Sequence, residues 1–136
     1  MPEANSTWLL PRLIGTAKAH DLLITGRILS AREALDYGIV SRVVPPEELL
    51  GEAIRIGRDI ATNTAPVSVA VTKRLVWRQI FEADPVRAKA AEDLLFHWIG
   101  KQPDAAEGVT SFLEKREPRW SMSKSRDLPA EVAELL

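Results

Sequence analysis

The sequence predicts a mainly α-helical protein with one short β-strand. Apolar residues recur at intervals of three and four along most of the chain, whereas only residues 39–44 are rich in β-branched side chains between turn-forming residues. The 136 residues include 46% hydrophobic and 27% charged side chains and no cysteine. A chain of this length and composition can bury a core without disulfide bridges or metals, so we expect one compact domain.

The first helices are predicted from their start and stop signals. Residues 4–7 suit the cap of a helix that begins near Trp8. A second helix is expected to open at Gly15 and Thr16 and to close at Gly26, since glycine readily adopts the left-handed conformation that ends a helix. The N-terminal part is thus expected to begin with two short helices.

A third short helix and the strand follow. Ser30 and Glu33 fit a capping box, in which the hydroxyl accepts from the third helical amide and the carboxylate accepts from the Ser30 amide. Gly38 ends this helix, and residues 39–44 form the strand until the prolines at 45 and 46 stop it.

Longer helices are predicted in the rest of the chain. Apolar side chains at helical spacing mark them at residues 47–61, 66–81, 85–99 and 103–116, and the last three begin with a proline. The helix at 66–81 is apolar over a broad face, so we expect it to be well buried. Residues 117–136 carry prolines, serines and mixed charges and are expected to lie on the surface or on a partner chain.

Charge and targeting patterns exclude two classes of partner. The chain has 18 lysines and arginines against 19 aspartates and glutamates, for a net charge of −1, and the two signs alternate. Nothing therefore favours nucleic acid or a membrane surface, and no apolar run approaches the ~20 residues of a membrane span. The first five residues lack the basic and apolar regions of a signal peptide, and the absence of cysteine fits a reducing compartment. We expect a cytoplasmic protein without nucleic-acid or membrane partners.

Few side chains indicate chemistry by residue type alone. The sequence has no glycine-rich phosphate loop, no cluster of metal ligands and no nucleophile elbow. His20 and His97 stand alone on predicted helices, and a general base needs partners, so we assign both to structural or surface roles. The four tryptophans, at positions 8, 77, 98 and 120, are expected to anchor the core or an interface, because no basic groove accompanies them.

Charged residues at predicted helix ends have a structural interpretation. Glu3 precedes the capping residues of the first helix, where a carboxylate interacts favourably with the helix dipole. Lys115 and Arg116 close the last helix, where positive charge is favourable. On residue chemistry alone, the sequence indicates a mostly helical domain and no particular activity.

Four stretches, however, match the pattern of a known family. They are LPRLIG with the following AKA at 10–19, LITGRILSAREALDYGIV at 23–40, VVP at 43–45 and EGVTSFLEKR at 107–116. In this order and spacing they resemble the enoyl-CoA hydratase/isomerase family, which has the crotonase fold. The resemblance extends over about residues 2–120 and covers the C-terminal half of a family member.

The resemblance implies that residues 1–136 form the helical C-terminal half of the crotonase α/β fold. Residues 1–46 then make the end of the core with its one strand, residues 47–116 a helical oligomerisation region, and residues 117–136 a surface tail. Family members associate through these C-terminal helices, so a homo-oligomer, either a trimer or a hexamer of two trimers, is implied.

The resemblance also implies action on enoyl-CoA thioesters in fatty-acid metabolism, with no separate cofactor, since CoA is part of the substrate. In the family, two backbone N–H groups hold the thioester oxygen and stabilise an enolate. Those amides, and the two glutamates that hydratases use as acid and base, belong to segments that would precede Met1. We therefore expect the isolated chain to be inactive without the N-terminal half. The alternative is a non-catalytic helical oligomerisation module from a truncated or split gene.

Three residues match functional positions of the family. Pro2 and Glu3 resemble the start of a loop in which isomerase-type members carry a glutamate, and one carboxylate can move a proton between C2 and C4 of a 3-enoyl-CoA. Glu3 is the catalytic candidate, with hydration and isomerisation both left open. Phe112 and Lys115 match the aromatic residue and the lysine that hold the adenine and phosphate end of a CoA bound to a neighbouring subunit. By residue type alone, Phe112 could equally be a core residue and Lys115 a helix end.

Overall fold

The computed structural model of the protein describes residues 1–128, and within them every regular element is a helix. The chain divides into two compact units, Met1–Gly51 and Glu52–Leu136. The predicted mainly helical class is confirmed. No helix within the described residues has the length and apolar character that crossing a membrane requires.

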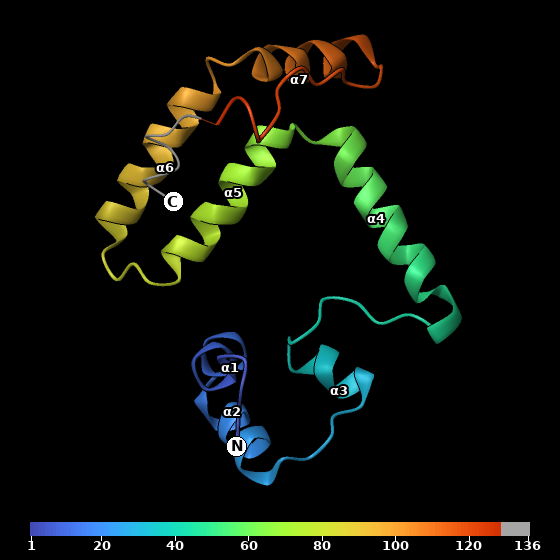
Figure 1. The fold of residues 1–136 in the computed structure, drawn as a ribbon, viewed down its shortest axis with the longest axis vertical. Helices are drawn as coiled ribbons and strands as arrows, with labels where there is room; N and C mark the ends of the chain where they lie inside the picture. The colour runs from blue at the N-terminus through green and yellow to red at the C-terminus, as the bar shows by residue number, and fades with distance from the viewer. Residues whose placement is uncertain (129–136) are drawn as a thin grey trace. The chain divides into compact units, whose positions relative to one another are not determined.

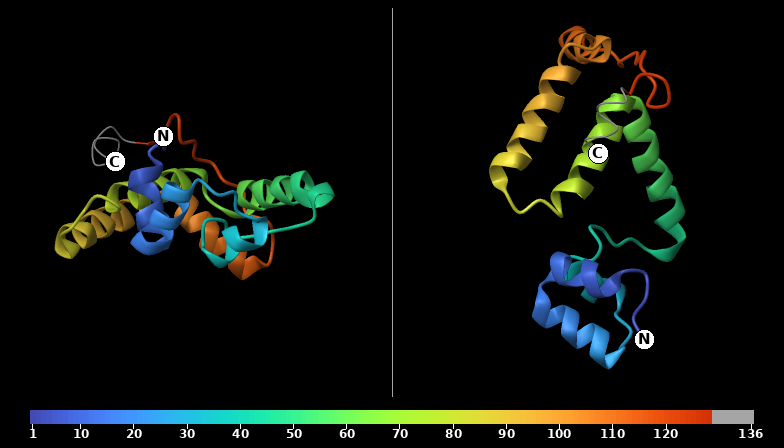
Figure 2. Two further views of the ribbon diagram at one scale, coloured as in Figure 1. Left: turned by 90° about the horizontal axis from the view of Figure 1, so that it is seen from below. Right: turned by 60° about the vertical axis from the view of Figure 1, so that its left-hand side comes forward.

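Two helices form most of the first unit. Helices α1 (Ser6–Ile14) and α2 (Thr16–Thr25) lie side by side, joined by Gly15 alone (Figure 2). Gly15 has a φ of 81°, which residues other than glycine rarely adopt. This backbone conformation permits the sharp change of direction between the two helices. Ala19 of α2 is completely buried. Its small side chain allows other parts of the first unit to pack closely against α2. The predicted boundaries at Gly15 and Gly26 are confirmed.

Helix α3 (Ala31–Asp36) is held in place by polar contacts. The predicted capping box is present: Ser30 Oγ accepts from the Glu33 amide at 3.2 Å, and the Glu33 carboxylate accepts from the Ser30 amide at 2.9 Å. Arg27 donates to Asp21 of α2 at 3.1 Å, to Glu33 at 3.0 Å and to the Tyr37 hydroxyl at 3.0 Å. The hydrogen bonds from Ser30, followed by that from Arg27, lower the pKa of Glu33 to about 2. These contacts tie the short helix to α2.

Replacing Ser30 by alanine is expected to weaken α3 by about 1 kcal/mol, because the Glu33 amide loses its acceptor. Hydrogen exchange of the α3 amides measures this loss as a lower free energy of local opening. Ser41→Ala is the matched control, since Ser41 is exposed and lies outside the helix. Equal effects of the two substitutions would contradict the role of the cap.

The predicted strand at residues 39–44 is wrong. Within residues 1–128 this stretch pairs with no other strand, and it forms an irregular connection after α3. The Ile39 and Val40 amides both donate to the Ala34 carbonyl, at 2.9 and 3.4 Å, and so complete the helix end. A β-branched sequence favours extended backbone, but a strand also needs a partner to accept its hydrogen bonds.

The second unit is built from longer helices. The 3₁₀ turn Pro46–Glu48 leads into α4 (Leu49–Asn63), which is followed by α5 (Pro66–Gln79), α6 (Pro85–Ile99) and α7 (Pro103–Glu114). Helices α5 and α6 lie side by side as an antiparallel hairpin (Figure 1). As predicted, a proline occupies the first position of α5, α6 and α7, where no intrahelical donor is needed.

The core of the second unit is small. Val67 and Val71 of α5 and Leu95 of α6 are buried together, with partly buried side chains around them from α5, α6 and the segment after α7, namely Leu75, Trp98, Ile99, Met122 and Leu128. The expectation that the helix at 66–81 is well buried is met along one edge only, since Val76 and Trp77 are exposed. Much of its broad apolar face therefore lies outside this core.

The segment after α7 turns back over the second unit. Trp120 Nε1 donates to the Thr62 carbonyl at 2.9 Å, and its ring lies beside Gly108 of α7. Met122 and Leu128 pack against the core. Residues 117–128 thus make internal contacts, whereas the rest of the predicted surface tail, residues 129–136, lies outside the described residues.

Candidate functional site

The C-terminal end of α7 brings together two residues that the sequence singled out. Lys115 follows the helix directly and has the left-handed conformation, with φ at 56°. Its Nζ lies over the Phe112 ring, 4.5 Å from the centroid, and Phe112 is 71% exposed. Phe112 is therefore not a core residue of this chain, while Lys115 does end the helix. Together they present an aromatic face and an ammonium group to solvent.

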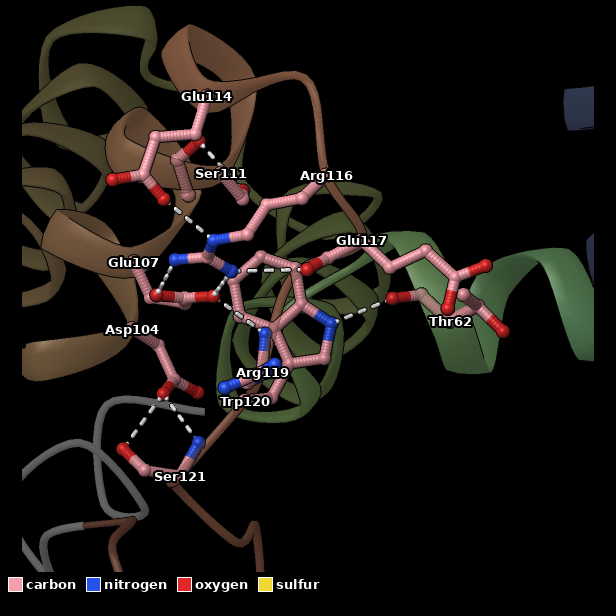
Figure 3. A network of polar contacts seen from close by, with 11 residues as sticks. Thr62, Asp104, Glu107, Ser111, Glu114, Arg116, Glu117, Arg119, Trp120 and Ser121 are labelled. Atoms are coloured by element: carbon pink, nitrogen blue, oxygen red, sulfur yellow. Dashed lines mark hydrogen bonds and ion pairs between the residues drawn. The ribbon is translucent and has the colours of Figure 1, made fainter.

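A network of ion pairs fixes the chain immediately beyond Lys115 (Figure 3). Arg116 makes a two-pronged contact with Glu107 of α7, at 2.6 and 3.0 Å, and its Nε donates to Glu114 at 2.6 Å. The Arg119 amide also donates to Glu107, at 2.6 Å. Because α7 and the returning segment are joined here, the left-handed turn at Lys115 is held from both sides.

The other end of α7 anchors the same segment. Asp104, in the first turn of α7, is only 4% exposed, and its Oδ1 accepts from the Ser121 amide at 2.8 Å and from the Ser121 hydroxyl at 3.0 Å (Figure 3). The Met122 amide donates to it at 3.3 Å. A carboxylate at this position also interacts favourably with the helix dipole. The segment after α7 is thus attached to the helix at Asp104 and at Glu107, and both attachments stabilise the reversal of the chain that begins at Lys115.

The Glu107 carboxylate links stability to pH. Its hydrogen bond with Arg116, and then that with the Arg119 amide, lower its pKa from 4.5 to about 2. An unfolded chain takes up the proton near pH 4.5 and the folded chain only near pH 2, so this stabilisation is complete above pH 4.5 and is lost as the pH falls towards 2.

We expect Glu107→Gln to unfold more easily than the parent at neutral pH and to lose less stability on acidification. Urea unfolding at about pH 6 and about pH 3, followed by tryptophan fluorescence, measures both effects. A variant with the full acid sensitivity of the parent would show that other carboxylates account for it, Glu33 among them.

Glu3 lies in the first unit, in the segment that leads into α1. The Glu3 carbonyl accepts from the Ser6 amide at 3.0 Å, and the two residues between them, Ala4 and Asn5, have left-handed conformations with φ of 54° and 56°. Asn5 is the N-cap of α1 but makes no side-chain cap. The Glu3 carboxylate is exposed and forms no hydrogen bond or ion pair within residues 1–128, so the capping role that its position suggested is not observed.

The histidines take the surface positions that the sequence indicated. His20 and His97 are exposed, and in each the Nδ1 lies near a carbonyl of the preceding helical turn, Thr16 at 2.9 Å and Asp93 at 2.6 Å. Among the described residues no three histidine, aspartate or glutamate side chains are grouped as metal ligands.

A family model described as enoyl-CoA hydratase/isomerase matches residues 1–123. The chain belongs to the enoyl-CoA hydratase/isomerase family. This confirms the resemblance carried by the four motifs of the sequence.

Relatives within the enoyl-CoA hydratase/isomerase family are considerably longer than this chain. An enoyl-CoA hydratase of Alternaria alternata is 38% identical over 119 residues, which are 87% of this chain and 40% of that protein. A carnitinyl-CoA dehydratase of Salmonella arizonae is 33% identical over 123 residues, or 88% of this chain and 47% of that protein. The chain thus spans less than half the length of these relatives.

Solved structures of the enoyl-CoA hydratase/isomerase family have the same fold over most of this chain. A probable enoyl-CoA hydratase/isomerase from Mycobacterium abscessus superposes with a TM-score of 0.85 at 43% identity, covering 88% of this chain and 49% of that one. The Bacillus anthracis enoyl-CoA hydratase gives 0.83 at 37% identity, covering 88% and 46%. The helices described here are the C-terminal half of the crotonase fold.

The structure also shows residues that sequence reasoning missed. Asp104, Glu107 and Arg116 hold the end of α7, and no helical spacing joins them to their partners. Trp77 lines a groove together with Lys73 and Lys124, so the expectation that no basic groove accompanies the tryptophans is wrong at this position. Only the cluster of Lys73 and Arg74 one turn before Trp77 could have indicated it.

Proposed function

We propose that this chain forms part of an enzyme that acts on enoyl-CoA thioesters in fatty-acid metabolism, with Glu3 as its acid/base and no separate cofactor. The observation that carries the proposal is the family match over residues 1–123, which includes the exposed, unpaired carboxylate of Glu3. The Alternaria and Bacillus relatives are enoyl-CoA hydratases, which supports this substrate class.

In the proposed reaction the Glu3 carboxylate removes a proton from C2 of a 3-enoyl-CoA. The electron pair of the C–H bond moves to form an enolate on the thioester oxygen. When the enolate collapses, the thioester carbonyl is restored and the C3–C4 double bond takes the proton from Glu3 at C4. The double bond thereby moves from C3–C4 to C2–C3. Hydration of a 2-enoyl-CoA passes through a related enolate, so both reactions belong to the proposal.

The enolate oxygen needs hydrogen-bond donors, which in this family are backbone amides outside the part matched by residues 1–136. We therefore propose that residues 1–136 bind the substrate incompletely and do not turn it over by themselves. Phe112 would pack against the adenine of CoA and Lys115 would neutralise its phosphate. Their exposure at the end of α7 supports this role, including for a CoA held by a neighbouring subunit of a trimer or hexamer.

The test compares the protein expressed from its complete coding sequence with residues 1–136 alone. Each is incubated with a 2-enoyl-CoA and a 3-enoyl-CoA, and turnover is followed by absorbance. We expect turnover by the former, and by residues 1–136 only after an N-terminal half is added as a second chain. Absence of turnover and of saturable CoA binding under all conditions would favour the non-catalytic oligomerisation module.

A further inference from the structure

A groove on α5 has the chemistry of an anion site. It encloses about 510 Å³ between α5 and the segment after α7. Lys73, Arg74 and Lys124 contribute three positive charges to its walls, and the remaining lining residues within the described part of the chain are apolar, among them Trp77 and Leu128. No carboxylate of the described residues lines it, although the chain as a whole has a net charge of −1.

The three cations have no hydrogen-bonding or ion-pair partner in the described part of the chain. Lys73, Arg74 and Lys124 make no hydrogen bond or ion pair within residues 1–128, whereas some other cations of the second unit are paired, such as Arg55 with Glu52 and Arg116 with Glu107. The repulsion among three unpaired like charges is relieved when an anion binds between them. Because no acidic residue of the described chain lines the groove, every charge along its walls is positive.

The groove also offers an aromatic surface. Trp77 is 47% exposed and stands four residues after Lys73 and three after Arg74, which places all three on one face of α5. An indole ring stacks on planar heterocycles, and lysine and arginine bind phosphate. The combination suits a ligand that carries a phosphate at one end and an aromatic ring at the other.

We propose that this groove binds an organic phosphate of the nucleotide class, with the phosphate among Lys73, Arg74 and Lys124 and the base against Trp77. The site goes beyond the function proposed above, because it uses none of the residues assigned to CoA or to proton transfer. Binding there requires no turnover of a thioester.

Calorimetric titration of the full chain with adenosine 5′-diphosphate tests the proposal. Lys73→Gln and Lys124→Gln are each expected to weaken binding about tenfold or more, since each removes a charge-assisted hydrogen bond. Arg58→Gln is the matched control, because Arg58 is an exposed cation of α4 without a partner in the described residues. Binding should also weaken as salt is added.

Lys115→Gln separates this groove from the end of α7. Loss of binding in Lys115→Gln, with Lys73→Gln unaffected, would assign the nucleotide to Phe112 and Lys115 and overturn the proposal. Failure of the parent chain to bind the nucleotide would overturn it as well. Two titrations test the aromatic part. The parent chain should bind ribose 5-phosphate, which has no base, more weakly than the nucleotide, and Trp77→Ala should bind the nucleotide more weakly than the parent. If both affinities equalled that of the parent chain for the nucleotide, stacking on Trp77 would be refuted. Because only binding is measured, these outcomes are independent of whether the enoyl-CoA activity is found.

Discussion

Glu3→Gln is expected to lower the turnover of a 3-enoyl-CoA by about 100-fold or more in the protein expressed from its complete coding sequence. Glutamine has nearly the shape of glutamate but cannot take up the C2 proton and return it at C4. The loss should appear in kcat, with a smaller change in KM, because in the proposed reaction the carboxylate acts on the reacting carbon and not on the CoA portion. Steady-state kinetics with the purified enzyme measure both constants.

Glu47→Gln is the control for this experiment. Glu47 is an exposed carboxylate of the same unit, in the 3₁₀ turn before α4, and its side chain forms no hydrogen bond or ion pair within the described residues. Its substitution should leave kcat unchanged. If Glu3→Gln also retained a kcat within about twofold of the parent, another group would have to move the proton.

Leu95→Ala is expected to destabilise the second unit by about 2–5 kcal/mol, through the lost burial and the cavity that remains. Leu95 is 2% exposed and packs against Val67 and Val71, which are the other buried residues of this small core. Urea unfolding followed by tryptophan fluorescence suits the measurement, since Trp98 packs against the same cluster.

The adjacent Leu94 provides an internal comparison. Leu94 has the same side chain on the same helix but is 53% exposed, so Leu94→Ala should change the free energy of unfolding by no more than about 0.5 kcal/mol. Similar losses for the two variants would mean that the core of the second unit does not lie at this cluster.

The helices were predictable because their signals are local. The capping box at Ser30, the closing Gly26 and the prolines that open α5 to α7 each act within one helical turn. The strand at residues 39–44 was not predictable in this way, since a strand exists only with a partner, and none is present in the part of the chain that the structure describes.

The candidate site shows the same division between local and distant contacts. Phe112 and Lys115 are three residues apart, in the last turn of α7 and directly after it, so the contact between them is local in the sequence once the motif is recognised. The pairing of Arg116 with Glu107 depends on the reversal of the chain after α7. That reversal also carries Lys124 to the α5 groove, where its charge adds to that of Lys73. No periodicity in the sequence encodes such a return.

The left-handed conformation of Lys115 favours the contact with CoA that we propose and disfavours stability. A helix usually ends in this conformation with glycine, which adopts it without the steric conflict of a Cβ. Lys115, with φ at 56°, bears that conflict and keeps an ammonium over Phe112. Lys115→Gly would relax the turn and remove the charge. Directed evolution of this protein for heat resistance alone would therefore favour variants that lack the proposed CoA contact, and a useful selection would have to require CoA binding at the same time.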